Sequence, residues 1–211
     1  NFDNKLVYDS KTKSYDISPF LITANNQRIE FFGQMRDTIS KDLTFKFENV
    51  NLASITPKID SISVKGIMNG SLNYKQLNQV IEPTANFTIA DFNLNNSELG
   101  NLKVAVEGRN SIRNFGVDIT LERNNIINFS AIGDLDFTSK KPTMDVLLEF
   151  DEFKLDPFSP LGKDVFTNIR GFAYGHAHLT GLLNNPTMEG ELFLDQAGLF
   201  LPYLNVDYDF E

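Results

Sequence analysis

The two histidines of this sequence have a spacing that could support metal chemistry. His176 and His178 lie two residues apart, so in a strand both imidazoles point to one face, which is compatible with zinc binding. They are the only histidines in the chain, and a catalytic zinc site needs a third protein ligand and an open position. An exposed strand face is therefore the favoured interpretation of this pair.

Two aspartate pairs have the spacing of a carboxylate dyad. Asp134 with Asp136, and Asp207 with Asp209, each place two carboxylates on one strand face, as a glycosidase requires. Both pairs alternate with apolar residues, which favours the solvated outer face of a sheet. A β-rich hydrolase that uses these aspartates or the two histidines stays the least favoured hypothesis.

Composition and missing motifs exclude further classes of function. The sequence has no Gly-x-Ser-x-Gly elbow, no phosphate-binding loop and no cysteine. Its formal net charge of -9 disfavours nucleic acid as a partner, because such binding depends on clustered Lys and Arg. We expect a protein that is not an enzyme, with no cofactor and no nucleic-acid partner.

The elements that must position these residues are strands. Apolar residues alternate with mostly polar ones in several segments, which places one apolar row on one face of each strand. The clearest rows lie in residues 43–47, 102–106, 115–121, 129–137 and 144–150. Turn residues separate them, with asparagine pairs at 25–26, 95–96 and 124–125. Helical turns are expected only at 75–82 and 160–166.

The C-terminal run from Gly171 to Phe210 carries the most specific pattern. Its strand-like glycines are followed by Asn185-Pro186, by Ala197-Gly198-Leu199 and by the ending Val206-Asp207-Tyr208-Asp209-Phe210. As a set, these features resemble the C-terminal region of the TamB family, the translocation and assembly module subunit of the bacterial envelope, in its Bacteroidetes-like form. The phrase Phe47-x-x-Val50-x-Leu52, followed by Gly66-x-x-x-Gly70, is similar in rhythm to the wider AsmA-like group.

The resemblance implies a fold, a location and partners. It implies a β-taco, an elongated curved sheet with an open hydrophobic groove, in the periplasm. Such a groove shields phospholipid acyl chains or nascent outer-membrane protein strands from water, and an outer-membrane Omp85-type partner receives the cargo. TamB relatives also carry an inner-membrane anchor, so residues 1–211 are expected to be one fragment of a longer protein.

The chain also shows signs of an internal repeat. The pattern Phe47-x-x-Val50-x-Leu52 recurs as Phe150-x-x-Phe153-x-Leu155, and the two glycines after it recur as Gly171-x-x-x-Gly175. The order of these matches predicts two copies of one all-β unit, at about 17–109 and 113–211. Tandem units of this kind bury one continuous apolar face.

The apolar rows are the candidate binding surface. On the periodicity alone, the closed core of a β-sandwich is favoured over an open groove, and a secreted sandwich that binds carbohydrate or protein is the alternative function. The resemblance favours an open groove instead. The residues expected to line it are Val104, Val106, Val117, Ile119, Leu121, Phe129, Ala131, Leu135, Met144, Val146, Leu148, Phe150, Leu192 and Leu194.

Overall fold

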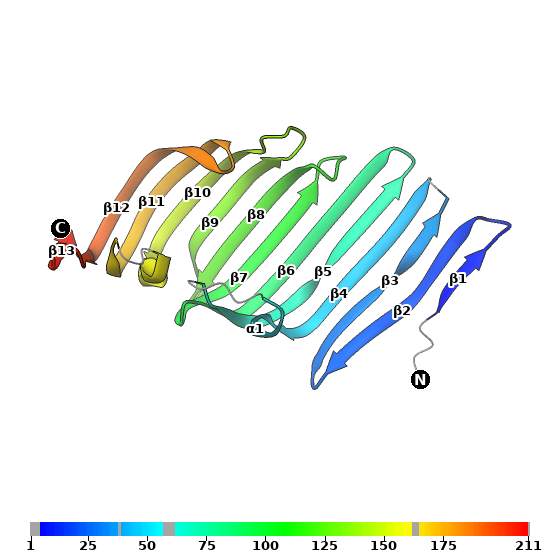
Figure 1. Cartoon of the computed structure of the whole chain (residues 1–211), viewed down its shortest axis with the longest axis horizontal. Coiled ribbons are helices and arrows are strands. Elements are labelled where there is room, and N and C mark those ends of the chain that lie inside the picture. Colours follow the sequence, from blue (N-terminus) through cyan, green and yellow to red (C-terminus); the bar gives the residue numbers. More distant parts are fainter. Residues whose placement is uncertain (1–4, 38, 57–61, 162–164, 211) are drawn as a thin grey trace.

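The chain forms one antiparallel β-sheet in which the strands follow each other in sequence order (Figure 1). The computed structural model describes residues 5–37, 39–56, 62–161 and 165–210. Thirteen strands lie side by side, and β1 and β13 form the two edges. Their bounds are β1 Leu6–Asp9, β2 Ser14–Ala24, β3 Gln27–Arg36, β4 Ser40–Asn51, β5 Val64–Leu77, β6 Val80–Leu94, β7 Ser97–Gly108, β8 Asn114–Arg123, β9 Ile126–Asp136, β10 Thr143–Lys154, β11 Thr167–Leu182, β12 Asn185–Leu201 and β13 Val206–Phe210.

The expected all-β class and the open, curved sheet are confirmed. All strands of the described residues belong to this one sheet, so no second sheet faces it as in a β-sandwich. Two short helical segments accompany it, α1 (Leu52–Ile55) and η1 (Asp156–Leu161). Within the described part of the chain, no helix is both long and apolar enough to cross a membrane.

Asparagine turns set the hairpin connections, as the sequence predicts. Asn95 and Asn96, between β6 and β7, have φ values of 52° and 66°. Asn124 and Asn125, between β8 and β9, have φ values of 55° and 63°. Two successive residues with positive φ are the signature of the type I′ turn, whose twist matches that of the flanking strands.

β-Bulges bend the sheet. The register of β4 with β5 shifts between Phe47 and Val50, and that of β10 with β11 shifts between Phe150 and Phe153. Each shift contains a residue in the left-handed region, Asn49 at φ 54° or Glu152 at φ 50°. An extra residue in one strand of a pair bends that strand and increases its local twist, which gives the sheet its curvature.

Buried apolar side chains form two clusters, and each includes a residue next to a bulge, Val50 or Phe153. One cluster joins Val50, Leu52, Met68 and Ile89, and so packs α1 against β4, β5 and β6. A second cluster joins Leu99, Leu121 and Phe153, with Phe158 of η1 packed against it. The bent strands and the two short helical segments therefore bury apolar side chains without a second sheet.

The two predicted repeats share an order of elements. In both halves a bulged strand leads into a short helical segment and then into a glycine-containing strand, as β4, α1, β5 and as β10, η1, β11. The division into units at 17–109 and 113–211 stays a prediction. Residues 75–82 are not helical but form the β5–β6 hairpin, and 160–166 lies partly in η1, with residues 162–164 outside the described ranges.

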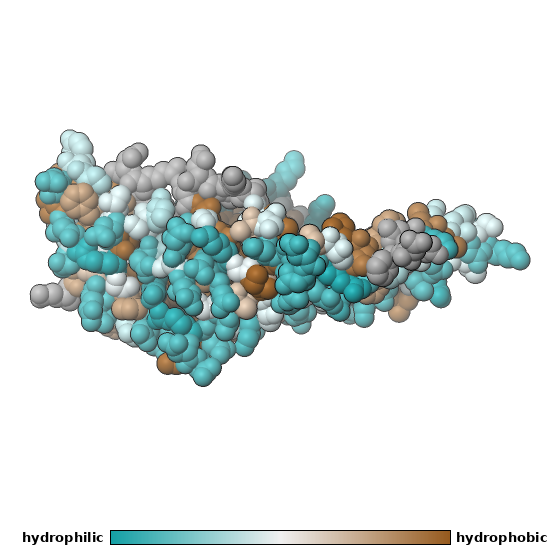
Figure 2. Space-filling model, turned by 90° about the horizontal axis from the view of Figure 1, so that it is seen from below, coloured by the Kyte–Doolittle hydropathy of each residue, from teal (hydrophilic) through white to brown (hydrophobic). Residues whose placement is uncertain are grey.

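The molecule changes in depth along its length. Seen from below, it is thin toward the β1 end and deeper toward the β13 end (Figure 2). Hydrophilic side chains cover the lower side of this view, and hydrophobic side chains show between them and toward both ends.

Candidate functional site

The strand register places all fourteen predicted groove residues on one side of the sheet. In the central row, Val104 pairs with Ile119, Ile119 with Ala131, and Ala131 with Leu148. The positions two or four residues away on the same strands hold the other predicted residues of β7 to β10. The same side continues across β11 to β12, where Leu192 and Leu194 lie. We call this side of the sheet the apolar face and the opposite side the polar face.

The apolar face extends beyond the residues that the sequence singled out. In the first half, Ile29, Phe31, Phe45 and Phe87 lie on the same side, and at the far edge Tyr208 does so as well. Their alternation with polar neighbours in the sequence was sufficient to predict this placement. At the β-bulges the alternation is harder to recognise in the sequence, because an extra residue shifts it by one position.

Burial on the apolar face is uneven. Leu121, Ala131 and Val146 are buried, at 3%, 6% and 5% exposure, although they were expected to line an open wall. Leu192 and Leu194 remain exposed, at 43% and 44%, and the other predicted residues are half-buried. Side chains of one curved sheet thus cover each other near its centre, while the surface toward β12 meets solvent.

Aromatic rings pack along the inner part of this face. Phe129, Phe150 and Phe153 form a cluster with ring centroids 5.3 to 5.5 Å apart, and Phe158 of η1 lies 5.8 Å from Phe153. In the first half, the rings of Phe31 and Phe45 stack at 4.3 Å. Such aromatic pairs contribute packing energy beyond the apolar area that they bury.

The histidine pair lies on the polar face. His178 contacts Asp145 with 2.6 Å between Nε2 and Oδ1, and His176 lies opposite Glu149 of β10 and Glu191 of β12. No group of three or more potential ligand residues among the described ones is arranged to hold a metal ion. The pair is exposed on the sheet surface, as its alternation predicts.

Both aspartate pairs have polar partners on the same face. Asp134 pairs with Arg109 at 2.9 Å. The carboxylate of Asp136 accepts hydrogen bonds from the side chain and the backbone amide of Thr138, which lower its pKa from the usual aspartate value.

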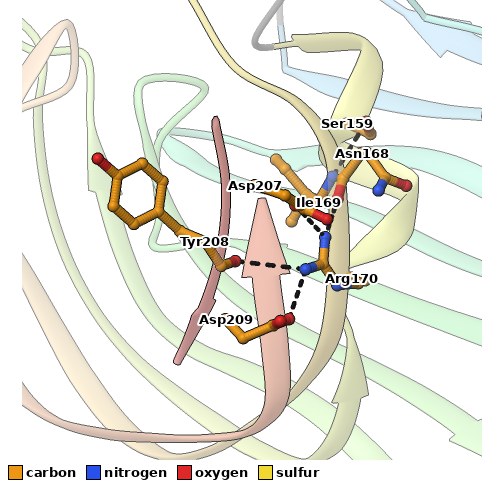
Figure 3. A network of polar contacts seen from close by, with 7 residues as sticks. All are labelled: Ser159, Asn168, Ile169, Arg170, Asp207, Tyr208 and Asp209. Carbon is orange, nitrogen blue, oxygen red and sulfur yellow. Dashed lines mark hydrogen bonds and ion pairs between the residues drawn. The ribbon is translucent and has the colours of Figure 1, made fainter. Parts of the chain in front are cut away.

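Arg170 binds the second aspartate pair and fastens the edge strand (Figure 3). From β11 its guanidinium reaches across β12, donating to Asp207 at 2.9 Å and to Asp209 at 2.5 Å. Hydrogen bonds to Asp209 and then Asp207 raise the pKa of Arg170 from its already high value. A Cβ at Gly198 of β12 would lie 2.6 Å from the carbonyl oxygen of Tyr208 and 2.5 Å from Arg170 Cζ, so a side chain there would displace both β13 and the guanidinium.

Glycines let strands approach closely in this region. Gly171 and Gly175 of β11 have φ values of 98° and 115°, a region that other residues rarely adopt. A Cβ on Gly175 would lie 2.2 Å from the carbonyl oxygen of Glu191. These glycines therefore serve the packing of β11 against β12.

Comparison of the chain with models of known protein families, with curated proteins and with solved structures finds no match.

Proposed function

We propose that this chain is part of a TamB-like envelope protein that works without catalysis, as a conduit or chaperone-like surface in outer-membrane biogenesis. Its place is the periplasm, within a protein held by an inner-membrane anchor and served by an Omp85-type partner in the outer membrane. Its cargo is phospholipid acyl chains or nascent outer-membrane protein strands.

One observation supports this proposal above the others. A single sheet carries apolar side chains on the same face from β1 to β13, and the described residues place no second sheet against that face. Covering such a surface with hydrocarbon is favourable, at about 0.8 kcal/mol for each CH₂ group removed from water. An acyl chain lying across the strands would gain this energy without any specific polar contact.

The alternative, a secreted β-sandwich binding module, agrees less well with the architecture. A sandwich needs two packed sheets, whereas the described strands form one. The part of this alternative that stays a prediction is the binding of a carbohydrate or a protein, which the single sheet would have to perform.

Photocrosslinking tests the proposal directly. The purified protein is mixed with vesicles that contain a phospholipid with a photoreactive acyl chain, and the crosslinked residues are identified by mass spectrometry. Crosslinks are expected on the exposed part of the apolar face, at Leu192 and Leu194.

A matched pair of double variants makes the test specific. Leu192→Ser with Leu194→Ser removes two exposed leucines from the apolar face, and we expect it to lower the crosslinking yield several-fold. Ile132→Ser with Leu147→Ser removes two similarly exposed residues, at 54% and 44%, from the polar face, and is expected to leave the yield unchanged. Equal losses in both variants would refute acyl-chain binding by the apolar face.

A further inference from the structure

The net charge of the chain is concentrated in its second half. Residues 1–109 contain twelve basic and twelve acidic side chains, whereas residues 110–211 contain seven basic and sixteen acidic ones. The whole formal charge of -9 therefore belongs to the part that begins just before β8. Most of these carboxylates lie on the polar face, because the apolar positions of each strand occupy the other side.

Exposed apolar side chains lie among these carboxylates. Ile132 of β9 and Leu147 of β10 are direct cross-strand neighbours, with 54% and 44% exposure. Phe193 of β12 is 65% exposed and lies opposite Tyr174 of β11. Large apolar residues on an otherwise polar surface are typical of interaction sites when they lie together.

Acidic residues separate the two apolar groups. Glu149, His176 and Glu191 form one cross-strand row over β10, β11 and β12. This row lies between the row that contains Leu147 and the row that contains Phe193. Among the described residues, no ion pair neutralises Glu149, Glu191 or Glu189. The pKa of Tyr174 is raised, first by burial and then by the nearby Glu152, Asp195 and Asp151. This shift agrees with a negative potential on the polar face around Tyr174.

A hollow lies next to this row. Its volume is 670 Å³, and Thr120, Ser130, Ile132, Glu149 and His176 are among its lining residues. The short side chains of Thr120 on β8 and Ser130 on β9 leave this volume unfilled, and it opens to solvent on the polar face. Glu149 accepts a hydrogen bond from the Ser130 hydroxyl at 3.3 Å. The surface therefore combines a depression, two apolar groups and carboxylates that no ion pair among the described residues neutralises.

We propose that the polar face of β8 to β12 is a docking surface for a basic, amphipathic polypeptide segment of a partner protein. Two strand spacings and four residues along the strands separate Leu147 from Phe193, which is about 16 Å. Side chains of an extended segment share a face when they are an even number of residues apart, and ends four to six residues apart lie about 13–20 Å from each other. Apolar side chains at the two ends of such a segment therefore contact the two groups. Lysine or arginine side chains between them lie over Glu149, Glu189 and Glu191.

Charge complementarity selects this occupant. A phosphate backbone or an anionic lipid surface is repelled by the same carboxylates. This surface is independent of the apolar face, so that acyl chains and a protein partner occupy opposite sides of one sheet.

Peptide binding to the intact 211-residue protein tests the proposal. The probe is a fluorescent peptide with the core Phe-Thr-Lys-Thr-Lys-Thr-Leu, in which Phe, both lysines and Leu share one face of the extended chain. Its binding is followed by anisotropy at low and at physiological salt. We expect saturable binding that weakens with salt, and about tenfold weaker binding to the triple variant Glu149→Gln, Glu189→Gln, Glu191→Gln. Exchanging both lysines of the peptide for glutamate is expected to abolish binding.

A second triple variant provides the matched control. Asp42→Asn, Glu82→Gln and Glu107→Gln remove three exposed carboxylates from the polar face of the first half, and binding is expected to persist. The proposal is overturned if the lysine peptide does not bind, if the glutamate peptide binds equally well, or if both triple variants behave alike. Ion-pair partners and buried positions are avoided in both triples, so that the fold is preserved.

Discussion

Replacing Leu148 with arginine distinguishes an open apolar face from a covered one. Leu148 lies at the centre of β10, is half-buried, and has the small residues Ala131 and Ala177 as its cross-strand neighbours. An arginine at this position can lay its methylene groups over the two alanines and extend its guanidinium to water. We therefore expect the Leu148→Arg protein to fold.

The expected magnitude follows from the burial of the side chain. Full burial of a leucine contributes about 1.5–3 kcal/mol, so a half-buried one contributes about 1 kcal/mol. For a chain of this size, that loss lowers the melting temperature by about 2–4 °C. Under a second sheet, the unpaired charge would instead cost several kcal/mol.

Val146→Arg is the matched control on the same strand and face. Val146 is only 5% exposed and lies against Gly133, where a Cβ would come within 2.6 Å of the Val146 Cα atom. An arginine here is buried without a partner, and we expect a loss of at least about 10 °C. The reasoning is refuted if Leu148→Arg lowers the melting temperature as much as Val146→Arg does. If the apolar face carries acyl chains, Leu148→Arg also loses photocrosslinking to lipid while it stays folded.

Three further predictions concern the edge strand, a titrating group and the shape of the molecule. Arg170→Ala is expected to accelerate amide hydrogen exchange in Val206–Phe210 at least several-fold, since it removes both ion pairs to β13, whereas Arg109→Ala, which breaks one exposed pair, should leave this segment unchanged. The lowered pKa of Asp136 means that its stabilising contribution is present above the ordinary aspartate pKa and is lost as pH falls through the folded value; carboxyl NMR titration should show this lowered pKa, and Thr138→Val should raise it. No upward shift in that variant would show that the Thr138 hydroxyl is not its main cause. Small-angle scattering of the monomer is expected to give a radius of gyration above about 17 Å, the value for a compact globule of this length, and a globular value would contradict the elongated sheet.

Much of the fold follows from local patterns in the sequence. Alternation places Val104, Ile119 and Leu148 on one face without any knowledge of their partners, because side chains on a strand alternate strictly. Asparagine pairs such as Asn124-Asn125 predict hairpin turns, because their positive φ values are accessible to asparagine at little cost.

Other features depend on contacts that no local pattern contains. Asn49 and Glu152 occupy bulges although the residues around them look like ordinary strand, and the shifts follow from pairing with β5 and β11. Residues 75–82 contain helix-forming residues, yet two residues at the centre of that stretch form a hairpin turn, with Asn78 at φ 56°. Leu121 is buried because Leu99 and Phe153 pack against it, whereas Leu192 is exposed.

The strictly sequential strand order has a consequence for how the chain acquires its structure. Each strand needs only the preceding one as a template, so the sheet can form hairpin by hairpin as the polypeptide emerges from a ribosome or a translocon. Contacts between neighbouring strands carry a small loop-closure cost compared with those of a Greek-key topology. Removal of a terminal hairpin also leaves the remaining ladder intact, so stability should decline in steps rather than collapse at once. A molecule built in this way can change its length by whole hairpins during evolution without redesign of a common core.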